Sequence, residues 1–256
     1  MNTGNFTQAD KVQIGASAGH EALSSSSYNS RIVKPDIGHL EKEKILNSGA
    51  NGSMGSPYKL LRTQVLRRME QLETNTLAVL GAHQGSGKTL TAINLAIAIA
   101  AETARTALLV DLDLRNPSVH QRLGFEPALG VEECLKSGRP VQDALVRVAG
   151  YDRLAILPAK NKVDNSSELL TDEVAGRLVN EIRTRYANRI IIFDLPPVLQ
   201  ADDALAFSKH IDVGLFVVHE GKTKREDVFR SIELLKDLKI MGTVLNGARE
   251  KLQAYY

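Results

Sequence analysis

Short apolar runs alternate with longer helical stretches from residue 76 almost to the end of the chain. The runs predict strands at Leu77–Leu80, Ala107–Val110, Leu154–Leu157, Ile190–Phe193, Val213–Val218 and Ile240–Leu245. The stretches between them predict helices at Leu90–Glu102, Val131–Ser137, Glu168–Tyr186, Ala201–Lys209 and Lys224–Lys236. Buried runs that alternate with helices are typical of a parallel sheet covered on both faces. The pattern therefore predicts an α/β fold with a mostly parallel central sheet.

The first part of the chain has a different pattern. Residues 1–55 are rich in Ser, Gly and Asn, so they offer little apolar area to offset the entropy of ordering. We expect a flexible polar segment there, with a short helix near residues 39–47. An amphipathic helix is predicted over Tyr58–Leu72. The predicted division is this segment, a folded domain at 56–249 and a tail at 250–256.

Composition narrows the class of protein. The 256 residues are 43% hydrophobic, which allows a substantial core, and the net charge of +2 argues against strong non-specific binding of nucleic acid. Cys134 is the one cysteine, so no disulfide forms within the chain and a reducing, cytoplasmic setting is expected. No apolar run is long enough to cross a bilayer. We therefore expect any link to a membrane to come through a partner.

The segment AHQGSGKT, residues 82–89, lies between the first predicted strand and its helix, which is the context of a phosphate-binding P-loop. Its glycines allow backbone N–H groups to turn around phosphate oxygens, and the helix N-terminus adds unpaired donors. Lys88 is predicted to neutralise β/γ-phosphate charge, and Thr89 to place its hydroxyl on Mg²⁺. The expected nucleotide contacts are Gln84, Gly85, Ser86, Gly87, Lys88, Thr89 and Leu90. The alternative, a chance glycine-rich turn, does not explain the flanking elements.

Carboxylates follow two other predicted strands. Asp111 and Asp113 follow the strand that ends at Val110, and Asp194 follows the strand that ends at Phe193. Ligands of parallel sheets bind at the carboxyl ends of strands, so we expect these groups near the P-loop. Phosphoryl transfer needs oxygen ligands for Mg²⁺ and a base or orienting group for the attacking hydroxyl. A strand-end Asp could instead cap a helix or a turn.

Three motifs together resemble those of the bacterial tyrosine kinases of capsule and exopolysaccharide systems, which are P-loop NTPases. They are GAHQGSGKT at 81–89, LLVDLDLRNP at 108–117 and IIIFDLPP at 190–197. NSSELL at 165–170 and VLN at 244–246 are also similar to that family. The polar start of the chain and residues 220–227 resemble the soluble autokinases of exosortase-linked exopolysaccharide loci.

The resemblance implies roles for individual residues. Asp111 would be the base that takes the tyrosine proton, Asp113 would support the metal, and Asp194 would hold Mg²⁺ through water. Related folds place an Asn at the position of Asn246 for a contact with adenine. Arg115 could pair with a phosphate or with a carboxylate. The implied catalytic residues are Lys88, Asp111, Asp113 and Asp194, and the implied metal residues are Thr89, Asp113 and Asp194.

Members of this family phosphorylate tyrosines in their own C-terminal tail, which implies Tyr255 and Tyr256 as acceptors. The expected activity is an ATP- and Mg²⁺-dependent protein-tyrosine autokinase that regulates exopolysaccharide or capsule synthesis and export. The resemblance implies a membrane copolymerase, or chain-length protein, as partner, recruitment to the inner face of the plasma membrane, and a cognate tyrosine phosphatase. No nucleic-acid partner is expected.

Two other functions stay open at this point. One is an ATPase switch of the partition or Min type with water as acceptor; such ATPases usually carry a second lysine where this chain has His83. The other is a nucleotide-binding regulator without catalysis. A homo-oligomer is a further possibility, but the ring-forming helix of the kinase family shows Glu-x-x-Arg-x-x-Arg. Here Ser56 and Lys59 replace the glutamate and the first arginine, and only Arg62 matches.

Overall fold

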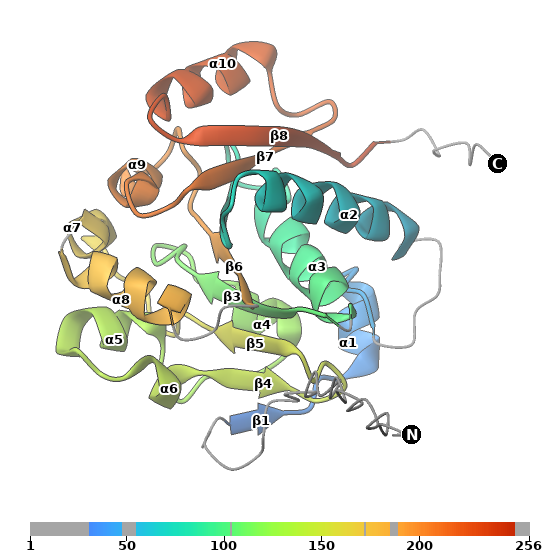
Figure 1. Ribbon diagram of the computed structural model, residues 1–256, viewed down its shortest axis with the longest axis vertical. Coiled ribbons are helices and arrows are strands. Elements are labelled where there is room, and N and C mark those ends of the chain that lie inside the picture. Colours follow the sequence, from blue (N-terminus) through green and yellow to red (C-terminus); the bar gives the residue numbers. More distant parts are fainter. Residues whose placement is uncertain (1–30, 48–54, 103, 172, 185–188, 249–256) are drawn as a thin grey trace, which may run out of the picture.

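A computed structural model describes residues 31–47, 55–102, 104–171, 173–184 and 189–248 of the chain. Within these residues the strands form one sheet in the order β1-β4-β5-β3-β6-β2-β7-β8 (Figure 1). Their bounds are β1 Arg31–Val33, β2 Thr76–Leu80, β3 Thr106–Asp111, β4 Val146–Val148, β5 Leu154–Leu157, β6 Arg189–Asp194, β7 Val213–His219 and β8 Lys239–Asn246. Neighbouring strands pair in parallel, except β4 and β5, which are antiparallel. The predicted α/β fold with a mostly parallel sheet is confirmed.

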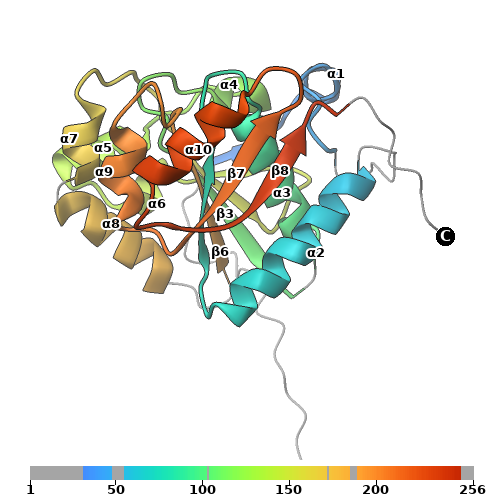
Figure 2. The same cartoon turned by 90° about the horizontal axis from the view of Figure 1, so that it is seen from above.

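Helices cover both faces of the sheet. One face carries α1 Ile37–Lys42, α2 Gly55–Gln71, α3 Lys88–Ala100 and α4 Val119–Leu123. The other carries α5 Val131–Ser137, α6 Val141–Ala144, α7 Ser166–Thr171, α8 Glu173–Thr184, α9 Asp203–Ser208 and α10 Arg225–Leu234. Figure 1 shows α10 and α2 on opposite sides of β8, and Figure 2 looks onto α10 from above.

The interior strand β2 is apolar from Leu77 to Leu80 because helices cover both of its faces. Leu77 and Val79 pack into the core on the α3 side, whereas Ala78 and Leu80 pack into the core on the opposite side. Successive side chains of a strand point to opposite faces, so a strand covered on both faces needs apolar residues throughout. The P-loop therefore follows an interior strand of the sheet, which lies between β6 and β7.

The structure confirms the six predicted strands as β2, β3, β5, β6, β7 and β8. Within the predicted helix Glu168–Tyr186, the described residues are helical and belong to α7 and α8, on either side of residue 172. These helices pack against different neighbours: α7 contacts α9, and α8 contacts α5 and β6. The strands β1 and β4 and the helices α4 and α6 are too short to have produced a periodic pattern in the sequence.

Residues 31–47 fold onto the domain, although composition assigns them to a flexible polar segment. β1 pairs with β4, and Leu40 and Ile45 are buried. The short helix expected near residues 39–47 is found at Ile37–Lys42. Asn94 of α3 accepts a hydrogen bond from the backbone N–H of Leu46 at 2.9 Å and holds the segment. The division into a segment, a domain and a tail stays a prediction.

Candidate active site

The P-loop joins β2 to α3 at the carboxyl end of the sheet. Gly85 and Gly87 have φ values of 78° and 93°, in the left-handed region that favours glycine. Lys88 is the first residue of α3, a helix of 13 residues, and its side chain is buried. The buried hydroxyl of Ser86 has no hydrogen-bond partner among the described residues. A turn of this kind at a helix N-terminus can cradle an anion.

Two buried carboxylates stand side by side next to this loop. Asp111 and Asp194 are direct neighbours in the register of β3 and β6, and both are fully buried. The oxygens of Asp111 accept hydrogen bonds from the backbone N–H groups of Asp113 and Ser118, each at 3.2 Å, and of Val119 at 3.1 Å. Neither oxygen of Asp194 has a hydrogen-bond partner among the described residues. Asp111 therefore caps α4, whereas Asp194 is left for another ligand.

Burial and like charge shift the ionisation of these groups. Burial raises the pKa of Asp194 to about 7, while the charge of Lys88 and the side chain of Thr89 act in the opposite direction. Burial, and then the charge of Asp194, raise the pKa of Asp111 well above its ordinary value. Burial lowers the pKa of Lys88, against the attraction of Asp194 and Asp113. Both carboxylates are therefore harder to ionise than an exposed aspartate, and a bound cation would favour their charged forms.

These residues fit Mg²⁺ bound together with a nucleotide. No group of three or more His, Cys, Asp or Glu side chains forms a metal cage in the described part of the chain. Mg²⁺ needs no such cage, because it usually takes one or two carboxylates, water and substrate phosphates. The unpaired carboxylate of Asp194 and the neighbouring side chain of Thr89 provide this kind of donor set. Asp113, whose pKa is raised by burial, accepts the backbone N–H of Asn116 at 3.1 Å.

Arg115 pairs with carboxylates in this structure. Its Nε donates to Asp203 and its Nη2 to Asp202, each at 2.8 Å. Asp203 is fully buried and also accepts the hydroxyl of Ser166. Of the two kinds of partner considered for Arg115, the carboxylate is the one observed, and its contact with a phosphate stays a prediction. No motif in the sequence indicates this network, because Arg115, Ser166 and the two aspartates lie far apart along the chain.

Three further contacts hold the P-loop. The side chain of Gln200 accepts the backbone N–H of Gln84 at 2.9 Å. His83 Nε2 lies 3.0 Å from a carboxylate oxygen of Asp227 on α10. The side-chain amide of Asn246, at the end of β8, donates to the carbonyl of Ser86 at 3.0 Å. Sequence reasoning missed the partners of Gln84 and His83 and expected Asn246 to contact adenine, which stays a prediction.

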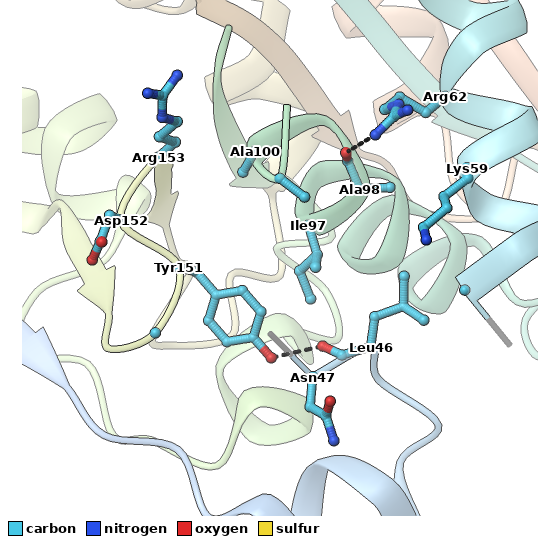
Figure 3. Close-up of a pocket in the computed structure, with 13 residues that line it drawn as sticks. Leu46, Asn47, Lys59, Arg62, Ile97, Ala98, Ala100, Tyr151, Asp152 and Arg153 are labelled. Carbon is cyan, nitrogen blue, oxygen red and sulfur yellow. Dashed lines mark hydrogen bonds between the residues drawn. The ribbon is translucent and has the colours of Figure 1, made fainter. Parts of the chain in front are cut away.

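A cavity of about 460 Å³ lies away from the P-loop, at the C-terminal end of α3 (Figure 3). Arg62 of α2 donates to the carbonyl of Ala98 at 3.2 Å, and Arg153 donates to the carbonyl of Glu102 at 3.5 Å. Cationic side chains at a helix C-terminus satisfy carbonyls that have no partner within the helix. Arg62 and Arg153 therefore stabilise the C-terminal end of α3, away from the P-loop site.

The sequence also led to expectations about the C-terminal tyrosines and about membrane-spanning helices. Tyr255 and Tyr256 lie outside the described residues. None of the described helices is both long and apolar enough to span a bilayer.

Comparison with known proteins agrees with the motifs. The profile of a family described as ParA, NUBPL iron-transfer P-loop NTPase, matches residues 73–251. Tyrosine-protein kinase YwqD of Bacillus subtilis is 28% identical over 78% of this chain and 83% of its own length. Tyrosine-protein kinase wzc of Salmonella typhi is 27% identical over 76% of this chain, but the match spans only 27% of that longer relative. The kinase domain of the Escherichia coli tyrosine kinase ETK has the same fold, with a TM-score of 0.72, 24% identity, and coverage of 88% of this chain and 91% of that domain. The resemblance to bacterial tyrosine kinases is confirmed.

Proposed function

The chain belongs to the ParA family of P-loop NTPases, and from that premise we propose that it is an ATP-dependent protein-tyrosine autokinase. The observation that carries the proposal is the fully buried carboxylate of Asp194 beside the P-loop lysine, which makes no well-formed hydrogen bond among the described residues and has the side chain of Thr89 as a neighbour that favours its charge. A buried carboxylate with so few donors is costly to keep unless a ligand compensates it. Magnesium with a nucleoside triphosphate on the P-loop supplies that compensation, and the tyrosine kinases among the relatives favour tyrosine as the acceptor.

In the proposed reaction the tyrosine hydroxyl attacks the γ-phosphorus in line, and the bond to the leaving ADP oxygen breaks. The ammonium of Lys88 and the N-terminus of α3 stabilise charge on the transferring group. Thr89 and Asp194 would hold Mg²⁺, directly or through water. Bound Mg²⁺ would neutralise charge on the phosphate oxygens.

Asp111 is the proposed base for the tyrosine proton. Burial and the charge of Asp194 raise its pKa, which favours the acceptance of a proton by this carboxylate. Its oxygens are occupied by backbone N–H groups and it is fully buried, so the acceptor hydroxyl would have to displace one of these contacts. Asp113 is less buried and lies within the electrostatic reach of Lys88, where it would support the metal.

The proposal extends to the setting of the reaction. Relatives named for polysaccharide transport, such as ExoP of Rhizobium meliloti, favour a role in exopolysaccharide synthesis and export. A membrane copolymerase as partner, recruitment to the inner face of the plasma membrane, a homo-oligomer and a cognate phosphatase belong to the same proposal. Iron transfer, the activity in the description of the family, finds little support in the residues. Iron–sulfur sites need several cysteine thiolates, and the one cysteine, Cys134, is buried with its pKa raised to about 12 by that burial.

The test uses the full chain incubated with MgATP, followed by mass spectrometry of the tail and measurement of released phosphate. We expect phosphate on Tyr255 or Tyr256, and a drop of about 10²–10³-fold in transfer for Lys88→Met. The double variant Tyr255→Phe/Tyr256→Phe should keep MgATP binding and lose incorporation. Phosphate release that is unchanged in this double variant, with no phosphotyrosine in the wild type, would support a switch ATPase instead. Binding of MgATP without any turnover would support a non-catalytic regulator.

A further inference from the structure

The two halves of the P-loop are held by different parts of the chain. The backbone N–H groups of Val198 and Leu199 donate to the carbonyls of Gly81 and Ala82, at 3.0 and 3.2 Å, and the side chain of Gln200 accepts the backbone N–H of Gln84 at 2.9 Å. This segment follows β6 and fixes the beginning of the loop. Between Gly85 and Gly87 two described hydrogen bonds come from outside the loop: the backbone N–H of Thr91 in α3 donates to the Gly87 carbonyl at 2.9 Å, and the side chain of Asn246 donates to the Ser86 carbonyl at 3.0 Å. Among these described contacts, Asn246 is the side chain that holds the Ser86 carbonyl.

Asn246 is itself rigidly placed. It is the last residue of β8, which pairs with β7 along its length, and its carbonyl accepts the backbone N–H of Glu220 at 2.9 Å. Its side-chain amide fills the space that a side chain at position 87 would need: a Cβ on Gly87 would lie 1.9 Å from the amide nitrogen. Gly87 and Asn246 therefore fit each other as a pair.

The contact constrains one peptide plane. In a trans peptide the carbonyl of one residue and the N–H of the next point in opposite directions. Because the Ser86 carbonyl is turned toward Asn246, the N–H of Gly87 is turned to the opposite side of the loop. Gly87 makes rotation of this peptide easy, because its φ adjoins the peptide plane and a glycine adopts left-handed and right-handed backbone conformations at little cost. Without a donor at position 246, the orientation of this N–H is no longer fixed.

We propose that Asn246 is a positioning residue that locks the Ser86–Gly87 peptide, so that the backbone N–H groups of the loop are ready to receive phosphate. The inference rests on the proposed function only in taking the P-loop as a phosphate site. It differs from a contact with adenine, because a residue that acts through the loop affects every ligand that carries the same phosphates.

The experiment compares dissociation constants of the full chain for MgATP, MgGTP and magnesium tripolyphosphate, measured by calorimetry, together with thermal unfolding without ligand. Loss of one hydrogen bond to the loop should weaken the binding of all three ligands by a similar factor, about tenfold, in Asn246→Ala. Asn246→Asp keeps the shape of the side chain but cannot donate and adds negative charge, so we expect at least as large a loss. The unfolding temperature should stay near that of the wild type.

Asp227→Ala is the matched control. It removes the contact of His83 with α10, which reaches the same loop but is partly exposed to solvent. Exposed pairs contribute little, so we expect less than a threefold change for each ligand. A loss at Asn246 that affects ATP and spares GTP and tripolyphosphate would overturn the proposal in favour of a base contact, and so would no loss at all. A fall in affinity matched by a fall in unfolding temperature would reduce the role to general stability and overturn it too.

These measurements separate the inference from the proposed kinase activity. A wild-type chain that binds the three ligands but does not phosphorylate tyrosine would contradict the autokinase, while the pattern of the Asn246 variants would still support the inference. A chain that binds none of the ligands would contradict both.

Discussion

Carboxylates at the two ends of the parallel sheet differ in how many hydrogen-bond donors surround them. At the amino end, Asp212 before β7 accepts the hydroxyls of Thr74 and Thr76 and a guanidinium N–H of Arg183. At the carboxyl end, Asp194 has no hydrogen-bond partner among the described residues although it is fully buried. Satisfied acids contribute to folding, and a buried acid without donors costs stability until a ligand arrives. The difference separates residues that support the fold from residues available for chemistry.

The same contrast holds between neighbours at the carboxyl end. Asp111 and Asp194 are register partners, yet backbone N–H groups surround only Asp111. One carboxylate thus organises the loop between β3 and α4, while its neighbour faces the P-loop lysine. Position at a strand end therefore does not by itself identify a metal-binding residue; the inventory of donors around it does.

Substitution of the two neighbours is the strongest way to break this comparison. Asp194→Asn should weaken magnesium-dependent nucleotide binding by about 10–100-fold, because it removes an anionic oxygen donor. Asp111→Asn should instead lower the free energy of unfolding by about 1–3 kcal/mol, because its NH₂ group would confront backbone donors. Calorimetry with and without Mg²⁺ and chemical denaturation distinguish the two effects. Equal effects of both variants on magnesium-dependent binding would contradict the assignment.

The pH dependence of the unfolding free energy is a second test of the role of Asp194, and its expected effect is smaller than that of the substitution. The folded chain keeps the proton of Asp194 up to about pH 7, whereas the unfolded chain releases it near the ordinary carboxyl value of 3.8. Between these values the folded state binds more protons, so the contribution of Asp194 to stability is present at low pH and is lost as pH rises toward 7. Unfolding of the wild type and of Asp194→Asn, followed from pH 4 to 8 without Mg²⁺, measures this difference.

Metal binding should depend on pH in the opposite sense. Mg²⁺ needs the ionised carboxylate, so the affinity for MgATP should rise as pH passes through about 7 in the wild type. The variant Asp194→Asn is the control, because it has no proton to lose at this position. An equally steep rise in the variant would show that another group is responsible.

Substitution of Asp212, at the amino end of the sheet, should have the smallest effect on nucleotide binding. Asp212→Asn weakens the contacts with Thr74, Thr76 and Arg183, but the carboxylate is partly exposed, so the expected loss in unfolding free energy is about 1 kcal/mol. Nucleotide affinity should stay within twofold of the wild type, as measured by the same calorimetry. A loss of affinity comparable to that of Asp194→Asn would remove the distinction between the two ends.

Sequence reasoning found the longer strands and missed the short ones. The strands β2, β3, β5 and β6 are predictable because a strand covered on both faces must be apolar throughout. β7 and the edge strand β8 are less buried, but their runs of seven and eight residues are long enough to show a pattern. β1 and β4, of three residues each, carry too little pattern, and β1 lies within residues that composition describes as polar. Apolar side chains such as Leu40 and Ile45 are few, but they suffice to hold this segment against the core.

In the site, too, some residues can be predicted from the sequence and others cannot. The P-loop and the strand-end acids follow from local motifs, because the chemistry of phosphate requires fixed residue types at fixed spacing. The pairing of Arg115 with Asp203 and of His83 with Asp227 joins segments far apart in the chain. No spacing rule encodes such contacts, since they arise only when the sheet brings the loops together.

The fit between Gly87 and Asn246 limits how this part of the protein can change over generations. A larger residue at position 87 meets two separate obstacles, a backbone with φ of 93° and an amide nitrogen only 1.9 Å from the place of its Cβ. A smaller residue at position 246 removes the second obstacle and leaves the first untouched. A substitution at position 246 therefore does not make a larger residue at position 87 acceptable. We expect glycine to be retained at position 87 whatever residue stands at the end of β8.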